Sequence, residues 1–244
     1  MSAPHSRALN YSSYLCLDEL LAAQRPRSEE HDELLFIVIH QVYELWFKQL
    51  LHELGGLQRW LEGGEGSRAL HTLRRVRAIL KTVVAQIDVL ETMTPLEFAG
   101  FRGRLESASG FQSAQFRELE AVLGRRDRGV LSAYPPEGDA YAQIAAALDR
   151  PSVYESFVVY LGGRGYSREA LLDVYRDGGE PAQVCEALVD VDEGVQEWRY
   201  RHVKMVERTI GGRPGTGGSA GAAYLQSTLF HPVFPDLWAI RSEM

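Results

Sequence analysis

The sequence predicts an all-α fold in a single domain covering residues 1–244, and three observations lead to this prediction. Apolar residues recur at spacings of three and four over long stretches, which is the period of an amphipathic helix. The period-two alternation of β-strands does not persist anywhere in the sequence, and no internal repeat is sustained. The 244 residues, 45% of them hydrophobic, suffice for one well-filled core. We therefore expect a helical bundle.

Two long helices are predicted in the first hundred residues. Residues 33–57 carry an apolar stripe and are also apolar around much of the remaining circumference at their start, so this helix is expected to be central. Its stripe consists of Phe36, His40, Tyr43, Phe47, Leu50 and Leu54. Residues 67–93 carry a second stripe and a basic outer face. Because only the short string "EGGEGS" separates the two helices, they are predicted to form an antiparallel pair.

Shorter elements are predicted in the middle of the chain. Thr94, Pro95 and Glu97 form a helix-start pattern: threonine caps the helix, proline fits its first turn, and glutamate completes a capping box. Residues 106–124 predict a loop followed by another helix. Prolines and glycine clusters interrupt residues 133–167, so short helices joined by loops are expected there.

The C-terminal third is predicted to hold the last long helix, over residues 187–212. The glycine-rich string "RPGTGGSAG", residues 213–221, follows as a loop. Residues 222–241 are expected to be helical at both ends, around Pro232 and Pro235.

Charge and cysteine content narrow the classes of function. The 26 Lys and Arg against 33 Asp and Glu give a net charge of −7. The basic footprint of a protein that binds nucleic acid or an anionic membrane is therefore missing. Cys16 and Cys185 lie far apart, without a CxxC or Cys/His cluster, which argues against a zinc site or a disulfide framework and fits a reducing compartment.

The sequence also predicts where the protein works and what it contacts. Its first residues lack the pattern of a secretory signal, and no apolar run approaches the roughly 20 residues of a membrane span. We therefore expect a cytoplasmic protein. Its partner is expected to be a small molecule or another copy of the chain, with neither nucleic acid nor membrane involved.

Two histidines lie on the apolar stripes of predicted central helices. His40 is on the first, and His202 shares the last long helix with Trp198 and Met205. Most buried histidines simply form hydrogen bonds, so a satisfied core histidine is one interpretation of each. A metal or a flat cofactor between them is the other, because each ring needs partners in an apolar setting. Non-haem iron would need a nearby carboxylate, whereas haem needs one axial histidine and an apolar slot, which fits His202 better.

Two further features also have a structural and a functional interpretation. The loop string "GTGGSAG" lacks the lysine of a phosphate-binding motif, so nucleotide binding is disfavoured. It is either a simple connection or a lid whose glycines let the backbone approach a ligand. Arg102, near Phe98 and Phe101, is either a solvated helix residue or a planar fork that binds a carboxylate.

Several long strings, taken together and in this order, resemble the tryptophan 2,3-dioxygenase family, haem enzymes that open the indole ring of tryptophan. The strings are "YSSYLCLDELL", "HDELLFIVIHQVYELWFKQLLHEL", "EFAGFR", "ASGFQSAQFRELE", "WRYRHVKMVERTIG" and "GTGGSAGAAYL". The resemblance runs from Tyr11 to Leu225 and is weakest between Leu123 and Leu188. Two patterns, "HDExLFIxxHQxxELWFKQ" and "SGFQSxQFR", are too long and unusual to arise from helical composition alone.

The resemblance implies a haem site with residues in specific roles. His202 matches the axial ligand of haem b, and O₂ is the co-substrate. His40 matches the catalytic, distal histidine that accepts a hydrogen bond from the indole N–H and orients the ring. Phe36, one turn earlier, matches an aromatic residue that packs on the indole.

The resemblance also implies how the amino-acid end of the substrate is bound. Arg102 matches the residue that pairs with the carboxylate, and Phe98 faces the same pocket. Thr216 matches the threonine that reaches the ammonium and carboxylate groups as its loop closes.

A further implication concerns assembly. The N-terminal segment, about residues 1–25, would contact a neighbouring subunit and complete its active site. The residues of this segment that match the family are Tyr11, Tyr14 and Leu15. The resemblance therefore implies a homo-oligomer, a tetramer built from dimers.

The function implied is conversion of L-tryptophan to N-formylkynurenine, in the kynurenine pathway of tryptophan catabolism. Ala220 stands where the family usually has a serine, and Val42 where it usually has a smaller residue. These departures leave a first alternative, a haem mono-oxygenase of the same fold that forms oxindoles from tryptophan or β-methyltryptophan, because a fold does not fix its chemistry. A second alternative is a non-catalytic haem-binding or scaffold protein.

Overall fold

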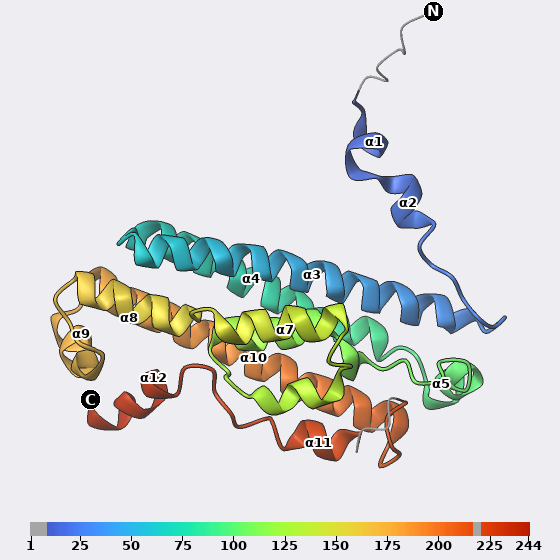
Figure 1. The fold of residues 1–244 in the computed structure, drawn as a ribbon. Coiled ribbons are helices and arrows are strands. Elements are labelled where there is room, and N and C mark those ends of the chain that lie inside the picture. Colours follow the sequence, from blue (N-terminus) through green and yellow to red (C-terminus); the bar gives the residue numbers. More distant parts are fainter. Residues whose placement is uncertain (1–8, 217–220) are drawn as a thin grey trace, which may run out of the picture.

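Two helices of 32 residues each form the centre of the computed structural model, which describes residues 9–216 and 221–244 (Figure 1). They are α3 (His31–Glu62) and α10 (Gly179–Ile210), and both pack along α4 (Gly66–Leu90). The described ranges contain helices, turns and loops but no β-strand. The prediction of an all-α fold is therefore confirmed, and so is the pairing of the first two long helices.

Shorter helices surround these three. The α-helices are α1 (Tyr11–Leu15), α2 (Leu17–Leu21), α5 (Pro95–Arg102), α6 (Ala114–Leu123), α7 (Asp139–Asp149), α8 (Val153–Gly163), α9 (Leu171–Asp177), α11 (Ala222–Gln226) and α12 (Pro235–Ala239). The 3₁₀ turns are η1 (Gly110–Gln112), η2 (Arg128–Ala133), η3 (Arg168–Ala170) and η4 (Ile240–Glu243). Helices α6 and α8 pack on α3, α7 packs on α6, and α11 packs on α10.

Helix starts and ends follow the predicted signals at most places. The Thr94 hydroxyl accepts a hydrogen bond from the Glu97 amide at 3.3 Å, and the Glu97 carboxylate accepts one from the Thr94 amide at 2.6 Å, which is the predicted capping box. The main difference is in α10, which begins at Gly179 instead of Ala187. Helix α9, just before it, was not predicted.

The packing of α10 on α4 is tight at Gly194. A Cβ atom at this position would lie 3.2 Å from Cδ1 of Leu80, which is closer than ordinary van der Waals contact. Glycine in a helix interior costs about 0.5–1 kcal/mol relative to alanine. The gain at Gly194 is the close approach of two core helices.

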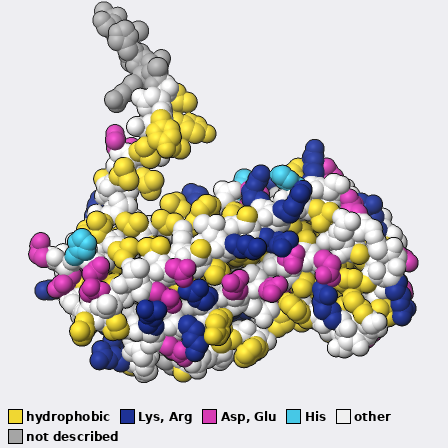
Figure 2. All heavy atoms as spheres, turned by 180° about the vertical axis from the view of Figure 1, so that it is seen from behind, with side chains coloured by type: hydrophobic (Ala, Val, Ile, Leu, Met, Phe, Trp, Pro, Cys, Tyr) yellow, Lys and Arg dark blue, Asp and Glu magenta, His cyan; other side chains and the backbone are white. Residues whose placement is uncertain are grey.

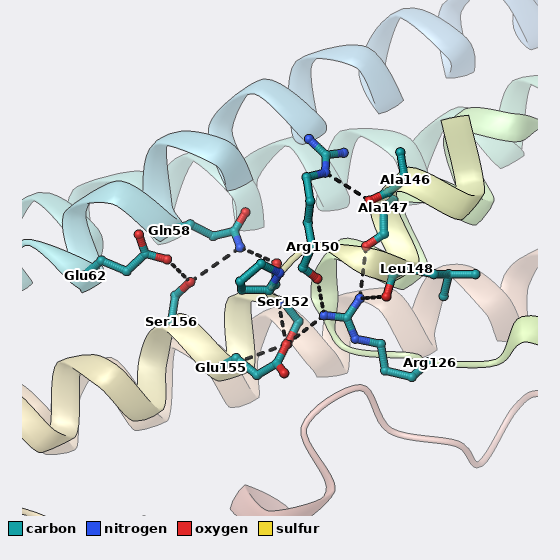
Figure 3. A network of polar contacts seen from close by, with 11 residues as sticks. Gln58, Glu62, Arg126, Ala146, Ala147, Leu148, Arg150, Ser152, Glu155 and Ser156 are labelled. Atoms are coloured by element: carbon teal, nitrogen blue, oxygen red, sulfur yellow. Dashed lines mark hydrogen bonds and ion pairs between the residues drawn. The ribbon is translucent and has the colours of Figure 1, made fainter. Parts of the chain in front are cut away.

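A polar network joins the end of α7 to the start of α8 (Figure 3). The Arg126 guanidinium donates to carbonyl oxygens at the end of α7 and just after it, those of Ala147, Leu148 and Arg150. It also donates to the Glu155 carboxylate at 2.7 Å, and Glu155 forms a capping box with Ser152 at the start of α8. Ser156 then donates to Glu62 of α3, so α8 is tied to the central helix.

We expect Arg126→Ala to lower the free energy of unfolding by about 1–2 kcal/mol, because charge-assisted hydrogen bonds are lost at two helix ends. The Ser152 amide and the Arg126 guanidinium lower the pKa of Glu155 to about 2. A carboxylate whose pKa is depressed by folding stabilises the fold above its ordinary pKa and ceases to do so as the pH falls through its folded pKa. The difference between wild type and variant should therefore shrink as the pH falls from about 5 towards 2.

Urea titrations over this pH range measure the effect. Arg128→Ala is a matched control, because its partner Asp149 forms an ion pair at the surface with both side chains more than half exposed. Such a pair contributes at most about 1 kcal/mol. Equal losses in the two variants would contradict the role assigned to Arg126.

The first described residues form an arm that stands away from the bundle (Figure 1). We use "the arm" for residues 9–22, which contain α1 and α2. Most of its large apolar side chains are exposed, and only Leu17 among them is partly buried: the exposed ones are Leu9, Tyr11, Tyr14, Leu15, Leu20 and Leu21. Figure 2 shows hydrophobic side chains on the arm and on the bundle beside it. The arm thus presents an apolar surface that its own chain does not cover.

Helix α3 is, among the described helices, the one long and apolar enough to cross a membrane, a test that the core helix of a globular protein also meets. It packs against α4, α6 and α8, and its buried stripe includes Phe47, Leu50 and Leu54. Its exposed face carries Leu34, Val38 and Leu45. The packing accounts for its apolar composition along the buried stripe.

Candidate functional site

A large cavity lies where α3, α5, α6 and α10 meet. Counted out to the solvent at its mouth, it encloses about 1510 Å³. Six of the predicted site residues line it: Phe36, His40, Phe98, Arg102, Thr216 and His202. The structure therefore brings together side chains that are far apart in the sequence.

The other predicted site residues lie elsewhere. Tyr11, Tyr14 and Leu15 belong to the arm, where they are 75%, 70% and 40% exposed, and none of them lines this cavity. Val42 is half-buried on α3 and does not line the cavity either. Ala220 lies outside the described residues. Within one chain the cavity is thus built without the arm.

His40 is held in one tautomer by its own helix. Its Nδ1 lies 2.7 Å from the carbonyl oxygen of Phe36, and because a carbonyl can only accept, Nδ1 must carry the proton. Burial lowers the pKa of His40 below its ordinary value, so the ring is neutral at pH 7. The neutral ring therefore keeps a lone pair on Nε2 as an acceptor for a ligand N–H group.

His202 faces the cavity from α10. The Trp198 ring stacks on it with centroids 5.0 Å apart and an angle of 5° between the planes. Burial and two neighbouring charges, with no hydrogen bond from the described residues, determine the environment of the imidazole, which favours the interpretation of His202 as a ligand over that of a satisfied core histidine. Burial, together with the neighbouring His40, lowers its pKa to about 4. A neutral imidazole with an unused lone pair is well suited to bind a metal.

Aromatic rings form one wall of the cavity. The Phe36 ring lies 4.1 Å from the His40 ring and 5.7 Å from that of Phe98, measured between centroids. The ring of Phe101, which is fully buried, packs against the Phe36 ring with 5.5 Å between the centroids. Such a wall favours a flat apolar ligand, because rings pack well at these distances.

Arg102 and Thr216 lie at the rim of the cavity and are both tied to the backbone. Nη2 of Arg102 donates to the carbonyl oxygen of Pro214 at 2.5 Å. The Thr216 hydroxyl donates to the carbonyl oxygen of Ala108 at 2.6 Å. These bonds connect the loop after α10 to α5 and to the loop that follows it. The guanidinium has further N–H groups with which to bind an anion.

A buried charge cluster in the cavity wall was not predicted from the sequence. Glu120 of α6 is 4% exposed and accepts hydrogen bonds from Arg117 and Arg199, each at 2.7 Å. Burial raises the pKa of Glu120, but the nearby arginines outweigh this and hold it below its ordinary value. Two buried guanidiniums around one buried carboxylate leave a net positive charge. The one available signal was that Arg117 belongs to the string "SGFQSAQFR".

Besides the net positive charge, Nε of Arg199 indicates that the cluster can bind a further chemical group. It is buried and has no hydrogen-bond partner in the part of the chain that the structure describes. Arg199 also donates to the carbonyl oxygen of His231, which ties α10 to the C-terminal segment. An anionic group bound here would balance the charge of the cluster.

Comparison with known proteins gives a consistent result. The family model described as Tryptophan 2,3-dioxygenase matches residues 2–145 and 137–244, which includes the stretch between Leu123 and Leu188. The chain is 64% identical to a tryptophan 2,3-dioxygenase of Anaeromyxobacter dehalogenans, with 98% of each chain covered. It is 53% identical to one of Herpetosiphon aurantiacus, over 98% of this chain and all of the relative, and 42% identical to one of Caulobacter vibrioides, over 97% and 98%. The chain belongs to the tryptophan 2,3-dioxygenase family.

Proposed function

We propose that the protein is a haem-dependent dioxygenase that inserts O₂ across the indole C2–C3 bond of L-tryptophan and releases N-formylkynurenine, in the kynurenine pathway of tryptophan catabolism. The observation that carries this proposal is the meeting of three groups in one cavity: the imidazole of His202, the acceptor of His40 and the guanidinium of Arg102. Membership of the family, at up to 64% identity, supports it.

The residues of the cavity fit haem b. His202 would hold the haem iron through its imidazole, and Trp198, Met205 and Val206 of the same helix would provide an apolar wall around it. Haem b also carries two propionate carboxylates, and the net positive cluster of Arg117, Arg199 and Glu120 suits such anions. When bound, the haem supplies the activation of O₂.

The remaining roles belong to the side chains that hold the substrate. His40 accepts the indole N–H at Nε2, and Phe36 and Phe98 pack on the ring. Arg102 pairs with the carboxylate, and Thr216 binds the ammonium and carboxylate groups. Fixing both ends of the substrate orients the C2–C3 bond, and the aromatic wall excludes water, which together account for much of what a protein adds to cofactor chemistry.

The neutral state of His40 predicts a pH dependence. Because burial holds the pKa of His40 below its ordinary value of about 6.5, the acceptor at Nε2 persists at neutral pH and is lost only as the pH falls below that value. We expect the KM for tryptophan to be flat above about pH 6.5 and to rise below it. Steady-state rates across this range measure the effect.

His40→Ala should keep the haem and part of the turnover, because it removes orientation and leaves the oxygen chemistry in place. His52→Ala is the control, since His52 lies exposed on the same helix and outside the cavity. Complete loss of turnover in His40→Ala, with haem content and tryptophan affinity intact, would instead assign His40 an obligatory proton transfer.

One assay tests the reaction itself. Ferrous protein is incubated with O₂ and either tryptophan or β-methyltryptophan, and the molecular masses of the products are measured by mass spectrometry. Two added oxygen atoms with ring opening support the dioxygenase, and one added oxygen atom without opening indicates a mono-oxygenase. Val42, one of the two departures behind that alternative, does not line the cavity. A protein without a haem absorption band after haem supplementation would be the scaffold of the second alternative.

We also propose a cytoplasmic homo-oligomer, a tetramer built from dimers, in which the arm of each subunit completes the cavity of a neighbour. The exposure of Tyr11, Tyr14 and Leu15 supports this, because a contiguous exposed apolar surface marks a contact site. Both cysteines are free thiols, which fits the reducing cytoplasm.

A further inference from the structure

A buried carboxylate binds the linker between the arm and the bundle, residues 23–30, close to the start of α3. Glu33, in the first turn of α3, is 2% exposed. Its Oε1 accepts the Arg27 amide at 2.8 Å, and its Oε2 accepts the Ser28 amide at 2.8 Å and the Ser28 hydroxyl at 2.5 Å. Both oxygens of the carboxylate are therefore used to fix the backbone of the linker.

Glu33 differs from the other glutamates that occupy the same position in helices of this protein. Glu97 and Glu155 are also the third residues of their helices, and each accepts a hydrogen bond from the amide of its own capping residue. Glu33 instead reaches past its capping residue, Glu30, to Arg27 and Ser28. Its carboxylate thus serves the linker and not the start of its own helix.

The other end of the linker is tied to the same helix. Nε2 of Gln41 donates to the carbonyl oxygen of Ala23 at 3.2 Å. Nε2 of Gln24 donates to Oε1 of Gln41 at 2.5 Å. With Glu33 at one end and Gln41 at the other, α3 holds the linker at two points, and the arm leaves the bundle in a fixed direction.

The linker also lies against α5, which carries Phe98 and Arg102. A Cβ atom on Gly100 would come within 3.0 Å of the Glu30 carboxylate carbon, so the end of the Glu30 side chain lies against α5 at this glycine. Glu33, Phe36 and His40 follow one another at spacings of three and four and so share one side of α3. The anchor of the arm and the wall of the cavity are therefore parts of the same rigid helix.

We propose that Glu33 is a positioning residue for the active site of the neighbouring subunit. Its carboxylate fixes the linker so that the arm reaches the partner's cavity in the orientation that completes it. This rests on the proposed function, in which the arm works in the neighbour. Glu33 touches neither substrate nor haem, and it acts only through the path of the chain between α2 and α3.

The first test is Glu33→Gln, which keeps the size of the side chain but places an amide N–H₂ against a backbone N–H donor. We expect the KM for tryptophan to rise about tenfold, because charge-assisted hydrogen bonds are lost, while the haem content stays at the wild-type level. Trypsin should cleave the linker after Arg27 faster than in wild type, because the bond after Arg25 precedes Pro26 and resists trypsin. Glu29→Gln is the matched control, since Glu29 is exposed in the same linker, and it should leave both readouts unchanged.

The second test separates an effect on the neighbour from an effect within the chain. Hybrid oligomers are formed from Glu33→Gln subunits, which have an intact cavity and a misplaced arm, and Arg102→Lys subunits, which have an intact arm and a faulty cavity. We expect the hybrids to recover turnover with a near wild-type KM, because each Glu33→Gln cavity receives a correctly placed arm. Hybrids whose turnover is only the sum of the turnovers of the two parent oligomers overturn the proposal. A Glu33→Gln protein with the wild-type KM for tryptophan overturns it as well.

A second variant and two further readouts cover the cases in which Glu33→Gln does not fold or wild type is inactive towards tryptophan. If Glu33→Gln does not fold, Ser28→Ala removes the hydroxyl bond alone and should give a smaller rise in KM and in trypsin cleavage; unchanged values there also overturn the proposal. If wild type itself does not convert tryptophan, the proposed function fails. The rate of trypsin cleavage and the oligomer size by light scattering then still decide whether Glu33 holds the linker.

Discussion

His202→Ala is expected to give a protein that no longer binds haem in stoichiometric amounts. Among the described residues, His40 and His202 are the histidines that line the cavity, and His40 belongs to α3, with Nδ1 bound to the carbonyl oxygen of Phe36. His202 is the one histidine on α10, so no second imidazole of this helix could take its place. Haem content is measured by absorption after reconstitution and purification.

Added imidazole gives this experiment an internal control. It should restore haem binding to His202→Ala, because the deleted ring leaves a space next to Trp198 that a free imidazole can fill. His231→Ala is the matched variant, since His231 is exposed and contributes its backbone carbonyl, not its ring, to Arg199. A normal haem content and an unchanged spectrum in His202→Ala would refute the assignment of the ligand.

Arg102→Lys is expected to weaken tryptophan binding strongly at unchanged haem content. A guanidinium binds a carboxylate through two parallel hydrogen bonds, whereas an ammonium offers a point charge. Truncating one partner of such a buried pair costs about 2–5 kcal/mol. Arg102 also donates to the Pro214 carbonyl, so a lysine could not hold the loop and the carboxylate at the same time. Titration of the ferric protein with tryptophan measures the loss.

Tryptamine, which lacks the carboxylate, decides what that loss means. It should bind wild type and Arg102→Lys about equally poorly, because the arginine has no carboxylate to pair with. If the substitution weakens tryptamine and tryptophan by the same factor, Arg102 has a purely structural role and the model of the site is wrong.

The long helices were predictable because their apolar stripes repeat over many turns. The prediction was less complete where local signals conflict with tertiary structure. Gly178, Gly179 and Pro181 look like a break in the sequence, yet Gly178 and Gly179 adopt positive φ angles and α10 starts there, with Pro181 tolerated in its first turn. The chain before Ala187 was therefore not assigned to α10, and α9 was missed.

The site was predictable where a residue belongs to an apolar stripe or to a family string. Phe36, His40 and His202 share both properties, and the cavity contains all three. Arg117, Glu120 and Arg199 were missed because a charged residue in a helical pattern usually faces solvent. Their burial depends on a bond between α6 and α10 that joins residues 79 positions apart, which a single sequence does not reveal.

The glycine at position 194 also affects how the helix that carries His202 is held beside the cavity. His40 is on α3 and His202 on α10, both helices pack on α4, and α10 comes closest to α4 where Gly194 meets Leu80. Gly194 lies about 12 Å along the helix from His202, at the rise of an α-helix. The absence of one methyl group, at a position that does not line the cavity, thus lets the helix that carries His202 lie close against the helix on which α3 also packs.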